Sequence, residues 1–461
     1  MKSIKLPFLG LLLVGSVALS AQEVAAKAVK YRRSSLHMIM IEDAALPNAK
    51  VIKDAFISSP LPDKYNDHSL PSRSFVAAKY ALTPEEKAAT GAKADGKGKA
   101  MMKGLAKGAA SSATGGLVDT TNTKDLPLVI EKYLNANNVA KDLVAKWFGR
   151  DSKGAFNMNL IGERGMYDAS ALDLNKAKSS ARGMASLADA GVELIGNTFV
   201  VVTRFNYVSK KEIYEATQKL ANAAKATGLG SKLPSTPSNP ALEAAKAEAY
   251  KKATEGYIVQ STSYLFQLNW NDSIEAVFYN DLWMDASNVD AKKKEAFDKT
   301  NLFTMKYIGD GKAFANVPMN LKVKRSDEEL VKIATLNASD AVVAKLQRDY
   351  EVFKTKTPLF SGNPITAKIG LKEGLEPNDK FEVLEQTMDE KTGKTVYKRV
   401  GKIKVNKDLI WDNRANAGEM VEETPAVDKD GKPLPPKPVL DCTTFKGGSK
   451  FYAGMLIRQI K

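Results

Sequence analysis

The positions of the apolar residues predict two strands in the first half of the chain. The segment SSLHMIMIE at Ser34–Glu42 places apolar side chains on both of its sides, a pattern typical of strands that are covered on both faces. We expect His37, in its middle, to pack inside the strand rather than to bind a ligand. A second segment, Asn197–Val208, is rich in β-branched and aromatic residues and also predicts a strand.

Apolar side chains spaced three and four residues apart predict helices around these strands. The expected helices are Ala49–Ser58, two that follow Asp125 and are separated at Asn135–Asn138, Asp173–Gly191, Lys210–Thr227, Pro240–Thr254, Asp290–Lys299 and Ser326–Lys354. The segment AFNMNLI at Ala155–Ile161 alternates apolar and polar residues and predicts another short strand, followed by a polar turn at Gly162–Gly165. Because helices and strands alternate, the pattern indicates a sheet covered by helices.

A pair of aromatic segments predicts a β-hairpin. Gly256–Trp270 and Ser273–Trp283 are rich in strand-forming residues, and the dipeptide Asn271-Asp272 between them is typical of a turn. One more strand is expected at Leu302–Ile308. An antiparallel pair would extend the sheet.

The last hundred residues predict a separate β unit. Short strand candidates alternate there with turns that contain Gly and Asp, which suits a small barrel. These candidates are Ile365–Leu371, Lys380–Glu385, Val396–Val405 and Phe451–Arg458.

Together these patterns predict a multidomain protein of the α+β or α/β class, with a mixed sheet under covering helices and a small C-terminal β-barrel. The expected parts are a signal peptide (1–21), an N-terminal strand and helix region (34–85), a basic mobile segment rich in Gly, Ala and Lys (86–118), an α/β domain (125–355) and the barrel (360–461).

The first residues have the order of a secretory signal peptide. Lys2 and Lys5 precede an apolar run at Pro7–Val17, and small residues follow at Ala18 and Ala21. The apolar run is shorter than the roughly 20 residues that a spanning helix needs. We therefore expect an exported protein that lies in the periplasm, or at the cell surface in association with the outer membrane.

The composition narrows the chemistry. The 461 residues include 2 His and 1 Cys, and 68 Lys+Arg against 53 Asp+Glu give a formal net charge of +15. One cysteine forms no internal disulfide, and so few His and Cys residues leave little room for a metal site. We expect neither a metal nor a cofactor. Cys442 either pairs with another chain, in an oligomer, or is a small packed residue.

The positive charge indicates an anionic partner. Nucleic acid is not expected, because no basic motif interleaved with aromatic residues accompanies the export signal. An envelope protein or an anionic envelope surface fits the compartment better, and it includes peripheral contact with a membrane. A lysine-rich surface that only keeps the protein soluble is the alternative.

Part of this charge lies in Gly91–Gly116. Gly, Ala and Ser dominate the segment, so it predicts a mobile linker. The alternative is contact with an anionic surface, in which lysines bind headgroups and neighbouring apolar residues enter the lipid. The candidate contact residues are Lys97, Lys99, Lys103 and Lys107.

The predicted aromatic hairpin supplies candidates for glycan chemistry. Trp270, Tyr279 and Trp283 are candidates for stacking on a sugar, although packing in the sheet explains them equally well. Paired carboxylates hydrolyse glycosidic bonds when their separation is suitable, but aspartates at hairpin ends are also common turn formers. The flanking carboxylates are Asp272, Asp281 and Asp285.

The remaining polar residues predict no catalytic, cofactor-binding or metal-binding site. No nucleophile-elbow, zinc-protease, phosphate-loop or EF-hand motif occurs in the sequence. Glu163 and Arg164 are expected to form a surface ion pair in the turn GERG. His68 lies in a polar loop, where a solvated side chain is expected.

Two parts of the chain resemble envelope-assembly proteins. FNMNLIGERG at Phe156–Gly165 and GVELIGNTFVVV at Gly191–Val202 resemble the α/β domain of the curli secretion channel and of TolB-type N-terminal domains. ITAKIGLKEGLEPNDKFEVLE at Ile365–Glu385 and GKTVYKRVGKIKV at Gly393–Val405 are similar to the C-terminal barrel of flagellar assembly protein T. The resemblance implies α/β domains joined to a terminal barrel, and no functional residue is carried across. No cysteine matches the lipidated anchor of the curli channel.

The sequence thus favours a non-catalytic exported protein of cell-envelope assembly or binding. One alternative is a carboxylate-based glycan hydrolase, and another is a surface adhesin or structural protein. The scarcity of histidine and cysteine weighs against an enzyme, since no other catalytic motif replaces them.

Overall fold

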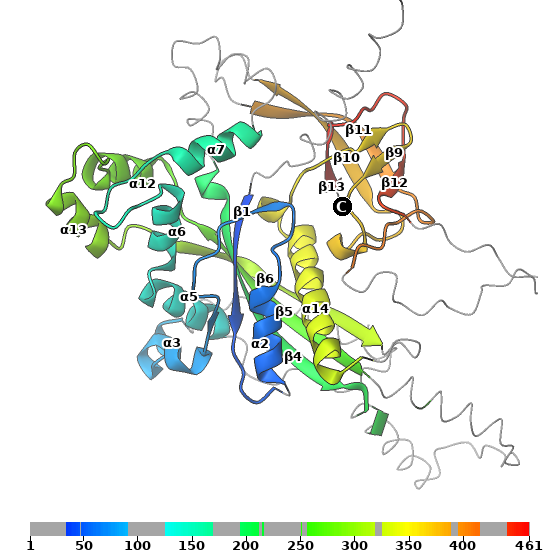
Figure 1. Cartoon of the computed structure of the whole chain (residues 1–461), viewed down its shortest axis with the longest axis horizontal. Coiled ribbons are helices and arrows are strands. Elements are labelled where there is room, and N and C mark those ends of the chain that lie inside the picture. The colour runs from blue at the N-terminus through cyan, green and yellow to red at the C-terminus, as the bar shows by residue number, and fades with distance from the viewer. Residues whose placement is uncertain are drawn as a thin grey trace, which may run out of the picture.

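The chain forms a central sheet with helices on both faces and a second, curled sheet beside it (Figure 1). The computed structural model describes residues 34–46, 48–90, 125–168, 194–211, 214–215, 250, 256–318, 325–388, 395–414 and 440–460. The helices predicted at Asp173–Gly191, Lys210–Thr227 and Pro240–Thr254 fall largely or wholly outside these residues. The expected leader 1–21 and Lys97, Lys99, Lys103 and Lys107 also lie outside them.

The central sheet is mixed, as the sequence predicts. Its strand order is β2-β1-β4-β5-β6, and β3 also pairs with β1. β1 runs parallel to β2, β3 and β4, whereas β4, β5 and β6 are antiparallel to one another in turn. The strands are β1 (Ser34–Ile41), β2 (Tyr65–Asp67), β3 (Ser74–Phe75), β4 (Thr198–Ser209), β5 (Gly256–Leu268) and β6 (Met305–Pro318).

Strand β1 is buried along its whole length, because a helical layer covers each face of the sheet. Ile39 and Ile41 join the core on one face, and Leu36, Met38 and Met40 join the core on the other. This explains why the sequence of β1 is apolar on both sides rather than alternating. The strand predicted at Ser34–Glu42 is therefore confirmed, with His37 fully buried in it.

The helices divide between the two faces. One layer holds α5 (Leu126–Ala136), α6 (Val139–Trp147), α12 (Asp272–Val277) and α13 (Ala291–Lys299), with α3 (Pro84–Thr90) and α7 (Asn159–Asp168) beside them. The other layer holds α2 (Ala49–Ser58) and the long α14 (Asp327–Asp349). The break predicted between the first two helices is present, because Asn138 takes a left-handed conformation there.

Helix α14 is the longest described helix, and its start is fixed by a reciprocal cap. The Ser326 hydroxyl accepts from the Glu329 N–H, and the Glu329 carboxylate accepts from the Ser326 N–H. Its buried side includes Val331, Ala338 and Leu346, which pack on the sheet. A short 3-10 turn, η5 (Glu351–Phe353), then leads to the second sheet.

The C-terminal sheet is antiparallel, with the order β7-β13-β10-β11-β12-β9-β8. Its strands are β7 (Thr357–Pro358), β8 (Ser361–Gly362), β9 (Ile365–Ala367), β10 (Lys380–Met388), β11 (Thr395–Val405), β12 (Thr443–Lys446) and β13 (Leu456–Ile460). The two edge strands β7 and β8 are separated by only two residues, so the sheet must curl. Closure into the expected barrel is not seen among the described strands, which form an open ladder.

Two predicted strands are wrong. Ser273–Trp283 forms α12 and a π-helical turn, η4 (Phe278–Leu282), instead of the second strand of a hairpin. The reason is local, because the Asn271 side chain accepts from the N–H groups of Ser273 and Ile274 and so caps a helix. Ile274, Phe278 and Leu282, spaced four apart, then reach the core. Strand β5 pairs with β4 and β6 instead.

The strand predicted at Ala155–Ile161 is also wrong, since α7 begins at Asn159. The Asn157 side chain accepts from the Asn159 N–H just before the helix starts. Arg164 thus lies on a helix, three residues after the buried Ile161, rather than in a polar turn.

No helix within the described ranges is both long and apolar enough to cross a membrane.

Shortening Phe199 should test the core under α14. Phe199 is fully buried, and its ring meets that of Phe353 edge-on at 5.0 Å. Phe199→Ala should lower the free energy of unfolding by about 3–5 kcal/mol, because it removes transfer energy and leaves a cavity. Urea denaturation measures the change. Phe314→Ala, at a site 52% exposed on β6, is the control and should change it by less than about 0.5 kcal/mol.

Candidate functional site

Both histidines of the chain lie in one buried polar cluster at the edge of the central sheet. His37 of β1 and His68, just after β2, are fully buried. The expectation that His68 is solvated is therefore wrong. The aromatic rings of His68 and Trp147 lie 5.0 Å apart, so α6 covers the loop that carries this histidine.

Arg164 of α7 holds this cluster together. Its guanidinium stacks on the ring of Trp147 at 4.3 Å. It donates to the Ser35 hydroxyl at 2.8 Å, to His68 Nδ1 at 3.1 Å and to the Asp67 carbonyl at 3.0 Å. Burial lowers the pKa of Arg164 to about 10, which leaves it charged at neutral pH. The expected surface ion pair with Glu163 is wrong for Arg164, which is 6% exposed.

The hydrogen bonds fix the tautomer of His68. A guanidinium only donates, so Nδ1 of His68 accepts, and its Nε2–H donates to the Leu143 carbonyl at 2.9 Å. Both ring nitrogens are thus occupied. Burial, followed by the charge of Arg164, lowers the pKa of His68 to about 3. His68 is therefore neutral and engaged, which suits a structural role better than proton transfer.

The imidazole of His37 is also enclosed, and it forms one hydrogen bond. Its Nδ1 accepts from the Leu70 N–H at 3.3 Å, and its buried Nε2 has no hydrogen-bond partner among the described residues. Burial, followed by the charges of Arg73 and Lys146, lowers the pKa of His37 to about 3. Neither histidine lines any of the three cavities described below. A substrate in those cavities would not meet either imidazole.

The three aromatic candidates for sugar stacking are packed around one core ring. The ring centroids of Trp270, Tyr279 and Trp283 lie 5.6–6.0 Å from that of Phe148, which is fully buried. Their side chains are half-buried, so part of each ring is used in the core. The glycan-stacking role of these residues stays a prediction.

The flanking carboxylates do not share one strand end. Asp272 lies in the first turn of α12, Asp281 in the π-helical turn, and Asp285 in the loop that follows. Hydrogen bonds from Ser287 lower the pKa of Asp285. A glycosidase acid needs the opposite shift, because it must hold its proton near neutral pH.

The largest cavity described is a groove of about 790 Å³. It lies between α3, the corner of α5 and α6, and the residues that precede β6. The lining of the groove combines apolar side chains with amides and hydroxyls. The apolar residues are Leu82, Leu128, Leu134 and Phe303, and the polar ones are Asn135, Asn138, Asn301, Thr300 and Thr304.

The charges in the groove offset one another. Lys132 pairs with Glu86 at 2.8 Å, and the Lys141 ammonium donates to the Asp298 carbonyl at 2.6 Å. Two lysines face two glutamates, the second being Glu131. The groove therefore offers apolar contact and neutral hydrogen-bonding groups, which is the chemistry of an uncharged, extended polypeptide rather than of an ion.

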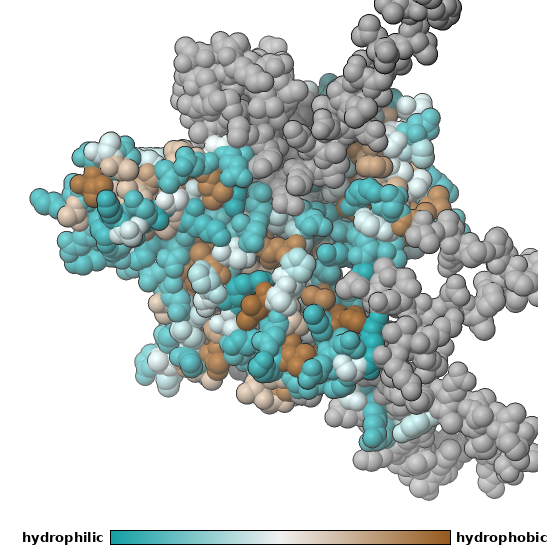
Figure 2. Space-filling model, viewed as in Figure 1, coloured by the Kyte–Doolittle hydropathy of each residue, from teal (hydrophilic) through white to brown (hydrophobic). Residues whose placement is uncertain are grey.

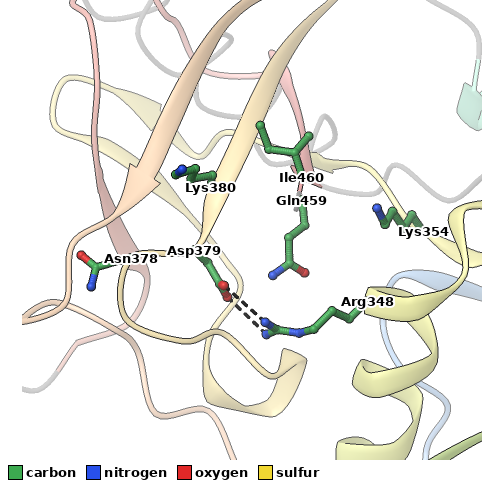
Figure 3. A pocket seen from close by; sticks show the side chains of 7 residues that line it. All are labelled: Arg348, Lys354, Asn378, Asp379, Lys380, Gln459 and Ile460. Carbon is green, nitrogen blue, oxygen red and sulfur yellow. Dashed lines mark hydrogen bonds and ion pairs between the residues drawn. The ribbon is translucent and has the colours of Figure 1, made fainter. Parts of the chain in front are cut away.

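A second, smaller cavity of about 250 Å³ lies where α14 meets the C-terminal sheet (Figure 3). Arg348 of α14 points toward Asp379, and its two terminal nitrogens each lie 3.3 Å from a carboxylate oxygen. Arg348 also donates to the Gly374 carbonyl at 2.5 Å. This bidentate contact fastens the C-terminal sheet to α14.

Other cations in this junction differ in how they are paired. Lys354 binds Glu351 at 2.8 Å. Lys380, the first residue of β10, has no ion pair within the described part of the chain. A further cavity of about 20 Å³ lies nearby and is too narrow for a ligand.

Cys442 carries no catalytic signal. It is a free, half-buried thiol, and burial raises its pKa. A reactive cysteine needs the reverse shift, toward the thiolate. Within the described residues, no group of three or more His, Cys, Asp or Glu side chains is arranged to hold a metal.

Sequence reasoning missed most of these features. One available signal was the helical spacing of Ile161 and Arg164, which places both on one face of α7. The groove had no signal, because α3, α5 and the residues before β6 are brought together only by the fold.

The buried histidines should make stability depend on pH. Unfolded histidines take up protons near pH 6.5, whereas folded His37 and His68 do so only near pH 3. The unfolded state therefore binds more protons between these values. Stability should rise with pH across this window and fall as pH drops below about 6.5, by up to about 1.4 kcal/mol per pH unit for each histidine.

A variant separates this contribution from that of the carboxylates. His37→Asn keeps an acceptor for the Leu70 N–H and removes one titrating group. Urea unfolding between about pH 4.5 and pH 6.5 should show a shallower slope for the variant, reduced by the share of one histidine. Equal slopes in the two proteins would show that His37 titrates normally in the folded state.

No protein-family model matches the chain, and no curated protein is significantly similar to it. The function is therefore argued from the groove, the junction and the buried cluster themselves.

Proposed function

We propose that this protein is a non-catalytic binding component of cell-envelope assembly that holds an extended segment of a partner protein. The observation that carries the proposal is the groove of about 790 Å³, whose lining combines apolar side chains, amides, hydroxyls and offsetting charges. Apolar side chains of a bound segment would contact the half-buried Leu82 and Leu128. Its backbone would exchange hydrogen bonds with side chains such as Asn135 and Asn301.

The buried cluster supports a binding role over catalysis. Both histidines are neutral and enclosed. In the aromatic region, hydrogen bonds from Ser287 lower the pKa of Asp285, whereas burial raises the pKa of Glu275. No histidine lines the described cavities, and of the two glutamates that line the groove, Glu86 is paired with Lys132. The glycan hydrolase and the adhesin remain alternatives that no geometric feature favours.

Export and envelope location rest on the predicted leader at 1–21 and on the resemblance to envelope-assembly proteins. The resemblance also supports closure of the C-terminal sheet into a small barrel, joined to the α/β part through α14. Export, envelope location, a closed barrel and the absence of a cofactor are therefore parts of the proposal.

Site-specific photo-crosslinking tests the groove. A photoreactive residue at Asn301, which is exposed and lines the groove, should form crosslinks to one extended segment of a partner protein in intact cells. The same residue at Asn280, exposed on the π-helical turn away from the groove, is the matched control and should not. Mass spectrometry identifies the crosslinked segment.

A substitution that fills the groove provides a second test of the same proposal. Asn301→Arg adds a long, charged side chain to a neutral groove, so crosslinks from a second photoreactive residue at Asn135 should decrease at least about tenfold. Equal crosslinking at Asn301 and Asn280, or no effect of Asn301→Arg, would overturn the proposal.

A further inference from the structure

Three lysines form a row across adjacent strands of the C-terminal sheet. Lys380 of β10 is directly opposite Lys404 of β11, and Lys404 is directly opposite Lys446 of β12. Residues that are directly opposite in a ladder point to the same face, and all three side chains are exposed. Lys402 lies on the same face, two residues before Lys404, and is exposed as well.

The opposite face of these strands forms the core. Phe381, Ile403, Val405 and Phe445, which alternate with the lysines, are all buried. The lysines are therefore held in place by their strands and cannot turn inward. Their common orientation follows from the register and not from side-chain contacts.

Within the described residues, no carboxylate forms an ion pair with a lysine of this row. Glu382 is the one acidic residue at the described register positions next to it, opposite Lys402, and its side chain is only 8% exposed. Arg458 of β13 occupies this carboxylate, with its Nη2 atom 2.6 Å away. Like charges placed directly opposite each other in a sheet are unfavourable. The fold therefore keeps a surplus of cations here at some cost in stability.

We propose that this lysine row, Lys380, Lys404 and Lys446 with Lys402 beside it, docks the protein onto an anionic membrane surface. Neighbouring strands are about 4.8 Å apart, so the row spans about 10 Å across a sheet face. Such a row of ammonium groups is complementary in charge to a surface of anionic headgroups. The row differs from the lysines of Gly91–Gly116, which suggested such a contact from sequence.

The face seen in Figure 2 is largely hydrophilic, which fits attachment to a membrane through charge rather than through insertion of apolar side chains. Hydrophilic residues cover most of the face seen in Figure 2, and apolar residues occur there as separate spots. Within the described ranges, no helix could anchor the chain across the bilayer. Binding should then depend on ionic strength, because screening weakens attraction between exposed charges.

Vesicle binding by the full chain tests the proposal. The protein should sediment with phosphatidylcholine vesicles that contain phosphatidylglycerol, and should not sediment with pure phosphatidylcholine. Lys404→Ser with Lys446→Ser should weaken binding to the anionic vesicles about 25-fold, at about fivefold for each lysine. Added salt should weaken binding of the unchanged protein as well.

A matched pair of lysines controls for net charge. Lys292 of α13 and Lys312 of β6 are exposed and lie outside the C-terminal sheet. Lys292→Ser with Lys312→Ser removes the same charge and should change binding by less than about twofold. Circular dichroism should show that both double variants fold like the unchanged protein.

Two results would count against the lysine row. Equal weakening by the two double variants would show that net charge alone drives binding, and would overturn the proposal. Binding to a soluble acidic polysaccharide but not to anionic vesicles would also overturn it. Asn301→Arg, in the groove, should leave vesicle binding unchanged, so the vesicle measurement does not depend on the proposed partner segment.

Discussion

The burial of β1 on both faces is the constraint on which the rest of the fold depends. This strand lies between two helical layers, so its polar side chains cannot form hydrogen bonds with solvent water. Ser35 and His37 must find their hydrogen bonds inside the protein or incur the desolvation penalty of a buried polar group. Arg164 donates a hydrogen bond to the Ser35 hydroxyl, and Arg164 belongs to α7, which is distant from β1 in the sequence.

Burying the Arg164 guanidinium requires hydrogen-bond acceptors for that side chain in turn. A buried guanidinium is stable only when most of its donors are satisfied and its charge is spread over polarisable neighbours. The ring of Trp147 and the acceptors Ser35, His68 and the Asp67 carbonyl supply this together. The cluster thus joins α6, α7, β1 and the end of β2 into one unit, and it uses the histidines for structure.

The sequence predicted the elements that depend on periodicity. The strand at Ser34–Glu42, the pair of helices after Asp125 and the long helix at Ser326–Lys354 all follow from apolar spacing, and the structure confirms them. Ser273–Trp283 misled because its aromatic residues favour strands, whereas a single capping side chain at Asn271 starts a helix. The prediction relied on the aromatic composition of the segment and did not take the Asn271 cap into account.

The candidate surfaces were harder to foresee for a different reason. The groove depends on the approach of α3, α5 and the residues before β6. The lysine row depends on the register of β10, β11 and β12, and the 37 residues 406–442 separate the last two of these strands in the printed sequence. Spacing along a chain carries no information on which residues become opposite neighbours across such an interval. Only the pairing of the strands reveals them.

The two proposed surfaces belong to different parts of the fold. The groove belongs to the layer of α3, α5 and α6, whereas the C-terminal sheet is fastened to α14, in the other layer, by the contact of Arg348 with Asp379 (Figure 1). A segment held in the groove would therefore leave the lysine row uncovered. Because the Arg348 contact is bidentate, it restricts rotation between the layers and the C-terminal sheet. The two proposals, a partner segment in the groove and an anionic membrane at the lysine row, therefore do not compete for one surface.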